Sequence, residues 1–146
     1  MSEVTASVLS LAGFALAEAV RRVCDVGAGV ALTPFTIEDR AEGRVLTEDV
    51  RETTGATSDE WAFAHESASH DGIVVDFRAP GMANAATIVQ RYERATSTVR
   101  AQLVGSPDIA AYDEPLDPNQ QVLVLERVES GVRDHPESER LWRYWT

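Results

Sequence analysis

The chain has 146 residues, of which 44% are hydrophobic and 25% charged, so we expect one folded domain over 1–146. Its 24 acidic residues outnumber its 13 basic residues and give a formal net charge of -11. This charge disfavours nucleic acid and anionic membrane surfaces as partners. The single cysteine, Cys24, cannot form an internal disulfide, and no apolar run is long enough to span a bilayer. The sequence therefore predicts a cytoplasmic protein.

The N-terminal third predicts a helix followed by a hairpin. Apolar residues recur every three or four positions over 4–26, which is typical of a helix with one buried face. The β-branched run 30–37 predicts a strand, and Pro34 within it favours an edge position or a bulge. The polar run 38–43 ends in Gly and predicts a hairpin loop that leads to a second strand over 44–51.

A second helix is expected over 57–69. Thr57 and Glu60 have the spacing of a capping box, in which each side chain binds the other's backbone N–H group. Trp61, Ala64, His65 and Ala68 would then share one face of this helix.

The motif HESASHD at 65–71 ends this expected helix and contains His65 and His70. Helical zinc sites use histidines four positions apart, whereas a spacing of five places the two rings about 140° apart around the axis. One metal ion could not bind both, so we expect no metal site here. The motif is interpreted as the polar end of a helix, with a local ion pair between Glu66 and His70 that responds to pH.

Three strands follow in a predicted antiparallel meander over 73–78, 86–92 and 99–104, because apolar and polar residues alternate in each. The segment 105–118 contains three prolines and predicts a surface loop. The run 119–133 is ambiguous, since its β-branched residues favour a strand and its charge spacing favours a helix. We take it as a helix that begins after Asp117 and Pro118, followed by a short helix over 137–145.

The predicted order is helix, strand, strand, helix, three strands, helix, helix. An order of this kind predicts a single α+β domain in which the helices pack on a five-stranded antiparallel sheet.

No catalytic or cofactor-binding motif is recognisable. No serine has the context of a nucleophile elbow, and Cys24 lies in the apolar pattern of a helix, which predicts a buried and inert thiol. The glycines at 27 and 29 follow a helix and precede a strand, the reverse of a dinucleotide-binding loop. We therefore predict no catalytic residues, no metal and no cofactor.

Two surfaces are candidate interfaces. The segment 38–71 contains ten carboxylates and three arginines, which makes it either a solvated surface or a docking surface for a basic partner. The C-terminus holds Trp142, Tyr144 and Trp145, residue types that often anchor interfaces. These aromatic residues either dock on the protein's own sheet or form a homodimer contact.

The leading hypothesis is a non-catalytic adaptor or regulatory protein that binds another protein and acts as a homodimer. The alternative is a small-molecule-binding protein or small enzyme with a pocket between the sheet and the helices. Candidate lining residues for that pocket are Trp61, His65, Arg91 and Tyr92.

Overall fold

The computed structural model describes residues 3–26, 32–40, 43–48, 60–69, 71–79, 82, 85–93, 96, 98, 101–112 and 115–145. The N-terminal helix α1 (Glu3–Val20) continues as a π-helical turn, Arg21–Val26. The strands are β1 (Phe35–Arg40), β2 (Gly43–Glu48), β3 (Trp61–Glu66), β4 (Gly72–Arg78), β5 (Ala86–Glu93) and β6 (Gln102–Ala111). The chain then forms α2 (Pro118–Arg133), the short α3 (Ser138–Leu141) and a 3₁₀ turn, Trp142–Trp145.

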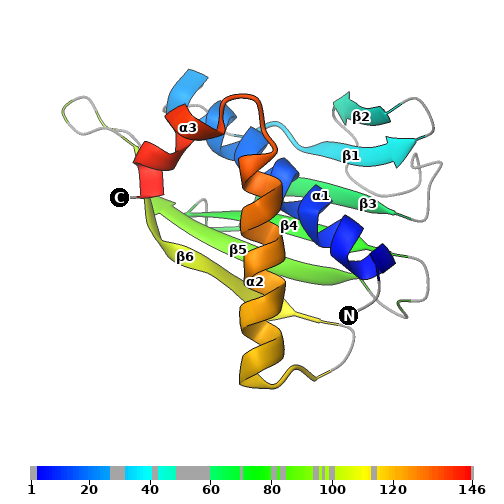
Figure 1. The fold of residues 1–146 in the computed structure, drawn as a ribbon. Coiled ribbons are helices and arrows are strands. Elements are labelled where there is room, and N and C mark those ends of the chain that lie inside the picture. The colour runs from blue at the N-terminus through cyan, green and yellow to red at the C-terminus, as the bar shows by residue number, and fades with distance from the viewer. Residues whose placement is uncertain are drawn as a thin grey trace.

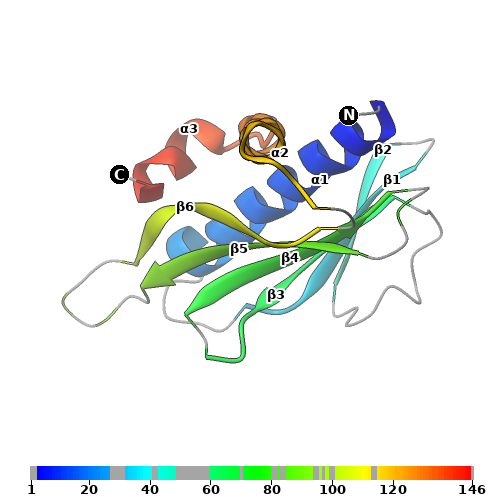
Figure 2. The same ribbon diagram turned by 90° about the horizontal axis from the view of Figure 1, so that it is seen from below.

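The strands form one antiparallel sheet in the order β2-β1-β3-β4-β5-β6. The helices lie on one face of this sheet (Figures 1 and 2). The α+β class and the antiparallel sheet are confirmed. The predicted five strands are wrong, since the sheet has six.

The additional strand is β3, where the sequence predicted a helix over 57–69. Trp61 and Phe63 point to one side of the sheet, Ala62 and Ala64 to the other, and all four are buried. A strand that is buried on both faces has no polar side, so its apolar run cannot be told from a short helix by periodicity. The predicted capping box begins at Thr57, which lies outside the described residues.

The first hairpin is confirmed, although β1 is not an edge strand. It lies between β2 and β3, and Pro34 precedes the strand, where its missing N–H group costs the sheet no hydrogen bond. The strands extend into the predicted loop, because Arg40 pairs with Gly43. Gly43 has a φ of 119°, which favours glycine.

The helix α1 is at the centre of the molecule. It packs against β1, β3 and β4 on one side and against α2 on the other, and Cys24 just beyond it is buried. Leu141 and Tyr144 of the C-terminal segment are buried in the same core. Among the residues that the structure describes, no helix is long and apolar enough to cross a membrane.

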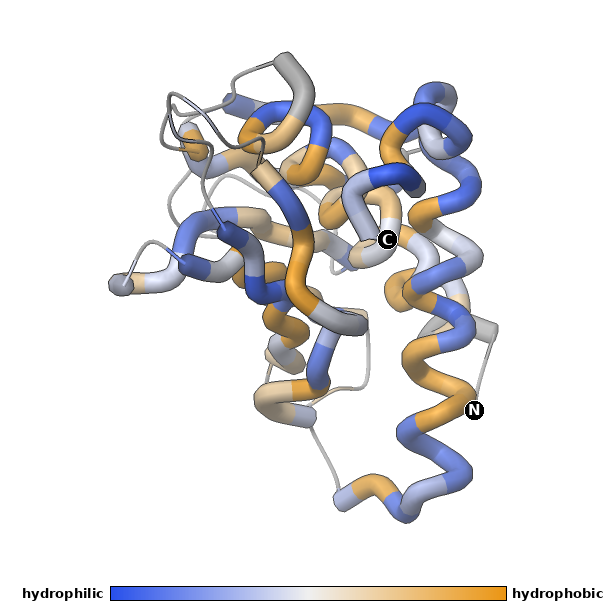
Figure 3. The backbone as a smooth tube through the Cα atoms, turned by 90° about the vertical axis from the view of Figure 1, so that its left-hand side faces the viewer, coloured by the Kyte–Doolittle hydropathy of each residue, from blue (hydrophilic) through white to orange (hydrophobic). Residues whose placement is uncertain are grey.

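The ambiguous run 119–133 is helical, as predicted. Asp117 caps α2 by accepting a hydrogen bond from the backbone N–H of Gln120, whose side chain in turn binds the backbone of Asp117, and Pro118 occupies the first turn. Figure 3 shows apolar and polar segments alternating along this helix, the pattern of a helix that buries one face.

The helices α1 and α2 cross with their backbones in contact. A Cβ atom added to Gly13 would lie 1.8 Å from the carbonyl oxygen of Val128, and one added to Gly131 would lie 1.9 Å from that of Ser10. Both glycines are therefore required by the close approach, which fixes where α2 stands above the sheet.

Candidate functional site

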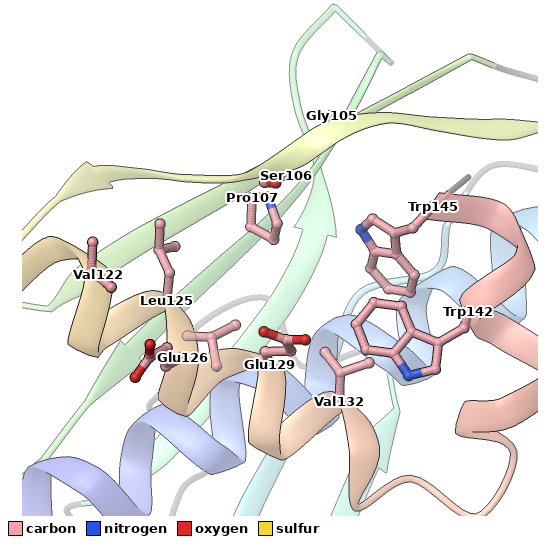
Figure 4. A pocket seen from close by; sticks show the side chains of 11 residues that line it. Gly105, Ser106, Pro107, Val122, Leu125, Glu126, Glu129, Val132, Trp142 and Trp145 are labelled. Atoms are coloured by element: carbon pink, nitrogen blue, oxygen red, sulfur yellow. The ribbon is translucent and has the colours of Figure 1, made fainter.

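A groove of about 570 Å³ runs between α2 and β6 (Figure 4). Two tryptophans stand at one end, Val122 lies towards the other, and Pro107 reaches from β6 towards the helix. The groove is lined mainly by apolar side chains, from Gly105, Ser106, Pro107, Val122, Leu125, Glu126, Val128, Glu129, Val132, Trp142 and Trp145.

The groove exists because α2 packs unequally on its two sides. The helix packs extensively against α1 and only sparsely against β6. Val124 and Gly131 on the α1 side are buried, whereas Val122 is 55% exposed. The strand β6 ends the sheet, and no described strand pairs with its outer edge. The groove therefore combines an exposed apolar helix face with an open sheet edge.

The strand wall of the groove is shaped by a bulge in β6. The pairing shifts from Val89 opposite Asp108 to Arg91 opposite Val104, and Gly105 within the bulge has a φ of 71°. The sequence predicted a loop from Gly105 onwards, and this is wrong because β6 continues to Ala111. The glycine and proline that suggested a loop belong to the bulge.

The buried side chain of Gln90 holds this bulge in place. Its Nε2 donates hydrogen bonds to the carbonyl oxygens of Gly105 and Arg91, each at 3.0 Å. Its Oε1 accepts a hydrogen bond of 3.0 Å from the indole Nε1 of Trp145. One amide thus joins β5, the bulge and the C-terminal tryptophan, so two walls of the groove are fixed relative to each other.

The charged groups of the groove are mainly acidic. Glu126 and Glu129 extend from α2, and Glu129 accepts a hydrogen bond of 2.9 Å from Arg133. The guanidinium of Arg133 lies 5.8 Å from the centre of the Trp142 ring. The rings of Trp142 and Trp145 contact each other with 5.1 Å between centres.

The groove continues beyond Leu125 into a second cavity of about 600 Å³. This part lies between the end of β6 and the start of α2, and Asp108, Tyr112 and Leu116 line it together with Gln121. The two cavities share Leu125, so the seam between α2 and β6 is open over much of its length.

The C-terminal aromatic residues have divided roles. Tyr144 is buried in the core, whereas Trp142 and Trp145 are partly buried and line the groove. Tyr144 therefore docks on the protein's own core, as one of the two predicted roles requires. Trp142 and Trp145 keep part of their ring surface open to a partner.

The four residues predicted to line a pocket are not brought together. Trp61, His65 and Arg91 lie on the sheet face opposite the helices, and Tyr92 lies on the helix side. The Tyr92 hydroxyl donates a hydrogen bond of 2.9 Å to the Oε1 of Glu66, which also accepts one from the backbone N–H of Leu32. Tyr92 therefore helps to fasten the chain that leads into β1.

A row of polar side chains crosses three strands on the face opposite the helices. The Nε2 of His65 lies 2.9 Å from the Oδ2 of Asp76, and the Thr87 hydroxyl donates to the Oδ1 at 2.6 Å. The hydrogen bond to Asp76 raises the pKa of His65 against the opposing effect of burial. Burial would raise the pKa of Asp76, but the hydrogen bonds from His65 and Thr87 lower it.

This row has the residue types of a catalytic group but not the geometry. The Nδ1 of His65 lies 3.2 Å from the carbonyl oxygen of Glu66, so both ring nitrogens are engaged. Thr87 binds Asp76 and not the imidazole, so no nucleophile is next to a free base. The row is best explained as a set of cross-strand contacts that stabilises the sheet.

The described residues of the motif HESASHD lie at the end of β3 and in the connection to β4, and not at the end of a helix. The backbone N–H of Ser67 donates to the carbonyl oxygen of Gly72, and the hydroxyls of Ser67 and Ser69 donate to Asp71. The hydrogen bonds from the two serine hydroxyls, that of Ser69 first, lower the pKa of the Asp71 carboxyl. His70 lies outside the described residues, and with it the predicted ion pair with Glu66.

A partly buried ion-pair network connects the end of α1 with the turn after α2. Glu18 accepts hydrogen bonds from Arg21 at 2.7 Å and Arg22 at 2.9 Å, and Arg22 continues to Glu48 at 2.5 Å. The Nε2 of His135 lies 3.0 Å from the Oε1 of Glu18. The backbone N–H of residue 137 donates to the Nδ1 of this histidine, so the proton is on Nε2, which donates to Glu18.

The electrostatics of this network keep Glu18 ionised. Burial would raise the pKa of this carboxyl, but the hydrogen bonds from His135, Arg21 and Arg22 hold it far below its usual range. A cavity of about 560 Å³ adjoins the network, and Phe14 and Arg44 contribute to its lining. Because these groups are bound to one another, the network is structural.

The predicted acidic surface is partly used by the fold itself. Glu38 is buried, Glu48 pairs with Arg22, and Glu66 binds Tyr92. Asp49 and Glu52 lie outside the described residues. Two described carboxylates outside this segment, Glu126 and Glu129, line the apolar α2–β6 groove.

Among the described residues, no group of three or more His, Cys, Asp or Glu side chains is placed to bind a metal ion. Comparisons with models of protein families, with characterised proteins and with solved structures find no match for this chain. The α2–β6 groove is therefore the candidate functional site on its geometry alone. Trp142 and Trp145, which the sequence identified as candidate interface residues, line this groove. The exposed Val122 was not identified from the sequence.

Proposed function

We propose that this chain is a non-catalytic protein-binding protein, and that a segment of its partner occupies the groove between α2 and β6. The observation that carries this proposal is the exposed apolar helix face, with Val122 55% exposed beside an open sheet edge. Apolar patches rimmed by polar groups commonly mark protein interaction sites.

The groove has the anchors and the rigidity that favour binding. Trp142 and Trp145 offer large apolar surfaces, and Trp is the residue most enriched among residues that dominate interface energies. The bulge is held by Gln90 and the helix by the crossing at Gly131. A preformed groove of this kind costs little ordering free energy when a partner binds.

A small-molecule-binding function is the second candidate. A volume of about 570 Å³ and an apolar lining with few polar groups are typical of small-molecule sites. The continuation of the groove into the cavity around Leu116 favours an elongated ligand, and a polypeptide segment fits that shape better than a compact molecule.

The homodimer predicted from the sequence remains a proposal. The partly buried Trp142 and Trp145 are its candidate contact. Two copies with a net charge of -11 each repel one another, so a dimer requires an apolar contact that outweighs this repulsion. Light scattering at low and high salt is the test, with dimer formation favoured by salt if the proposal holds.

The protein-binding proposal is tested by site-specific cross-linking in the cells that make the protein. A photoreactive phenylalanine analogue is placed at Val122 in the groove, and in a matched variant at the exposed Arg91 on the opposite sheet face. We expect one or a few protein adducts from position 122 and none of these from position 91. Equal adducts from both positions, or none from 122, would contradict the proposal.

A further inference from the structure

We propose, resting on the protein-binding function above, that the partner segment is basic as well as apolar. Its apolar side chains fill the groove against Val122 and Leu125, and its arginine or lysine side chains pair with Glu126 and Glu129. The partner is thus a cationic amphipathic segment of another protein.

The charges around the groove support a cationic ligand. Glu126 and Glu129 line the groove itself, and Asp108 lines the adjoining cavity. The helix α2 carries two arginines: Arg133 is already paired with Glu129, and Arg127 does not line the groove. The whole chain adds a net charge of -11, so a basic segment is attracted at long range and an acidic one is repelled.

The tryptophans provide a second contact for a cation. The guanidinium of Arg133 already lies 5.8 Å from the centre of the Trp142 ring, within the range of cation–π attraction. An arginine of the partner can use the face of Trp145 in the same way, since this ring also lines the groove. Arginine therefore fits the site better than lysine.

The same charges disfavour a second copy of the chain as the occupant. A second copy carries the same excess of carboxylates, so its approach to Glu126 and Glu129 is repulsive. An unrelated basic segment has no such cost.

The proposal is tested with an unbiased library of random linear peptides displayed on phage and selected on the intact protein. The same library is selected on a Val122→Arg variant, whose long basic side chain enters the groove and lies one helical turn from Glu126. Because Val122 is exposed, this variant is expected to fold. Peptides enriched on the parent protein and lost on the variant are those that depend on the groove.

We expect these groove-dependent peptides to combine arginine with leucine or aromatic residues. A synthetic representative should bind about tenfold more weakly to the double variant Glu126→Gln, Glu129→Gln, and more weakly in high salt. The matched control is Glu93→Gln, which removes an exposed carboxylate on β5 and should leave the affinity unchanged. Binding is followed by tryptophan fluorescence in a Trp61→Phe background, so that Trp142 and Trp145 report it.

Three results would overturn the proposal: acidic or uncharged peptides as the main groove-dependent class, an affinity unaffected by the double variant, or no groove-dependent peptide. Failure here is distinguishable from failure of the protein-binding function. A protein cross-linked at position 122 through an acidic or uncharged segment leaves that function intact and refutes only the cationic ligand. Concentration-dependent dimers that are lost in Val122→Arg would identify a second copy as the occupant.

Discussion

The two sides of α2 differ in how they meet the rest of the molecule. Towards α1 the backbones touch at Gly13 and Gly131, and no side chain can be added between them. Towards β6 the helix leaves a groove of about 570 Å³ lined by apolar side chains. One helix thus has a closed side, which belongs to the core, and an open side, which is available to a ligand.

The difference indicates that stability and binding are carried by separate faces of this helix. The closed side is built from small and β-branched residues that allow close packing, and burial there contributes directly to the free energy of unfolding. On the open side Val122 is exposed and contributes little to the stability of the fold. An exposed apolar side chain of this kind lowers solubility. Substitutions on the closed side should therefore lower the free energy of unfolding. Substitutions on the open side should weaken binding and leave the free energy of unfolding almost unchanged.

The largest loss of stability is expected for Gly131→Ala on the closed side. The new Cβ would lie 1.9 Å from the carbonyl oxygen of Ser10, so the helices must separate. We expect the free energy of unfolding to fall by about 3 kcal/mol, despite the better helix propensity of alanine. Urea unfolding measures it, with the exposed Ser130→Ala as the control. A variant as stable as the parent would show that the backbones of α1 and α2 do not need to touch at Gly131.

A somewhat smaller loss is expected for Glu18→Gln in the ion-pair network at the end of α1. Removing the carboxylate leaves Arg21 and Arg22 without their shared partner. We expect a loss of about 2 to 3 kcal/mol near neutral pH, which is less than for a fully buried pair because both guanidiniums are partly exposed. Urea unfolding of both proteins across pH measures it.

The pH dependence of this effect has a definite sign. The pKa of Glu18 is lower in the folded protein than its value of 4.5 in the unfolded chain. Its contribution is therefore complete above that value and decreases as the pH falls towards the folded pKa. The gap between parent and Glu18→Gln should narrow at about pH 3, and a constant gap would contradict the assignment.

The same substitution on the two sides of α2 provides the next comparison. Val124 is 0% exposed on the closed side, and Val122 is 55% exposed on the open side. We expect Val124→Ala to cost about 2 kcal/mol of stability and Val122→Ala less than about 0.5 kcal/mol. Equal losses in thermal or urea unfolding would show that the groove face is part of the core.

A smaller loss of stability than for Val124→Ala is expected for Gln90→Leu, which tests the support of the open side. The substitution leaves the carbonyl oxygen of Gly105 and the indole N–H of Trp145 without their partner. We expect a loss of about 1 kcal/mol together with faster amide hydrogen exchange in β6. Unchanged exchange in β6 would mean that the bulge does not depend on Gln90.

The sequence predicts most of this fold wherever one face of an element is buried. The alternation of apolar and polar residues in 73–78 and 86–92 predicts strands, and the capping residues at 117–118 predict the start of a helix. All three elements are present in the structure. The helix predicted over residues 61–66 is wrong because both faces of β3 are buried, so the sequence lacks the polar alternation of a half-exposed strand. The loop predicted from Gly105 onwards is wrong because glycine and proline occur both in loops and in bulged strands.

The groove is harder to predict than the fold, because it arises from the distance between two elements far apart in the sequence. Trp142 and Trp145 are identifiable as candidate interface residues from their type alone. That they line one groove with Pro107 and Val122 depends on the glycine crossing and on the buried amide of Gln90, and neither contact has a local pattern in the sequence.

The open side of α2 is tested most directly by mapping amide chemical shifts of the ¹⁵N-labelled protein while a groove-dependent basic peptide is added. We predict shifts at Gly105 and Ser106 and along α2 from Val122 to Val132, the residues that line the groove. The amides of His65 and Asp76 on the opposite sheet face should not move. Shifts centred on that opposite face, with the groove amides unchanged, would contradict the account.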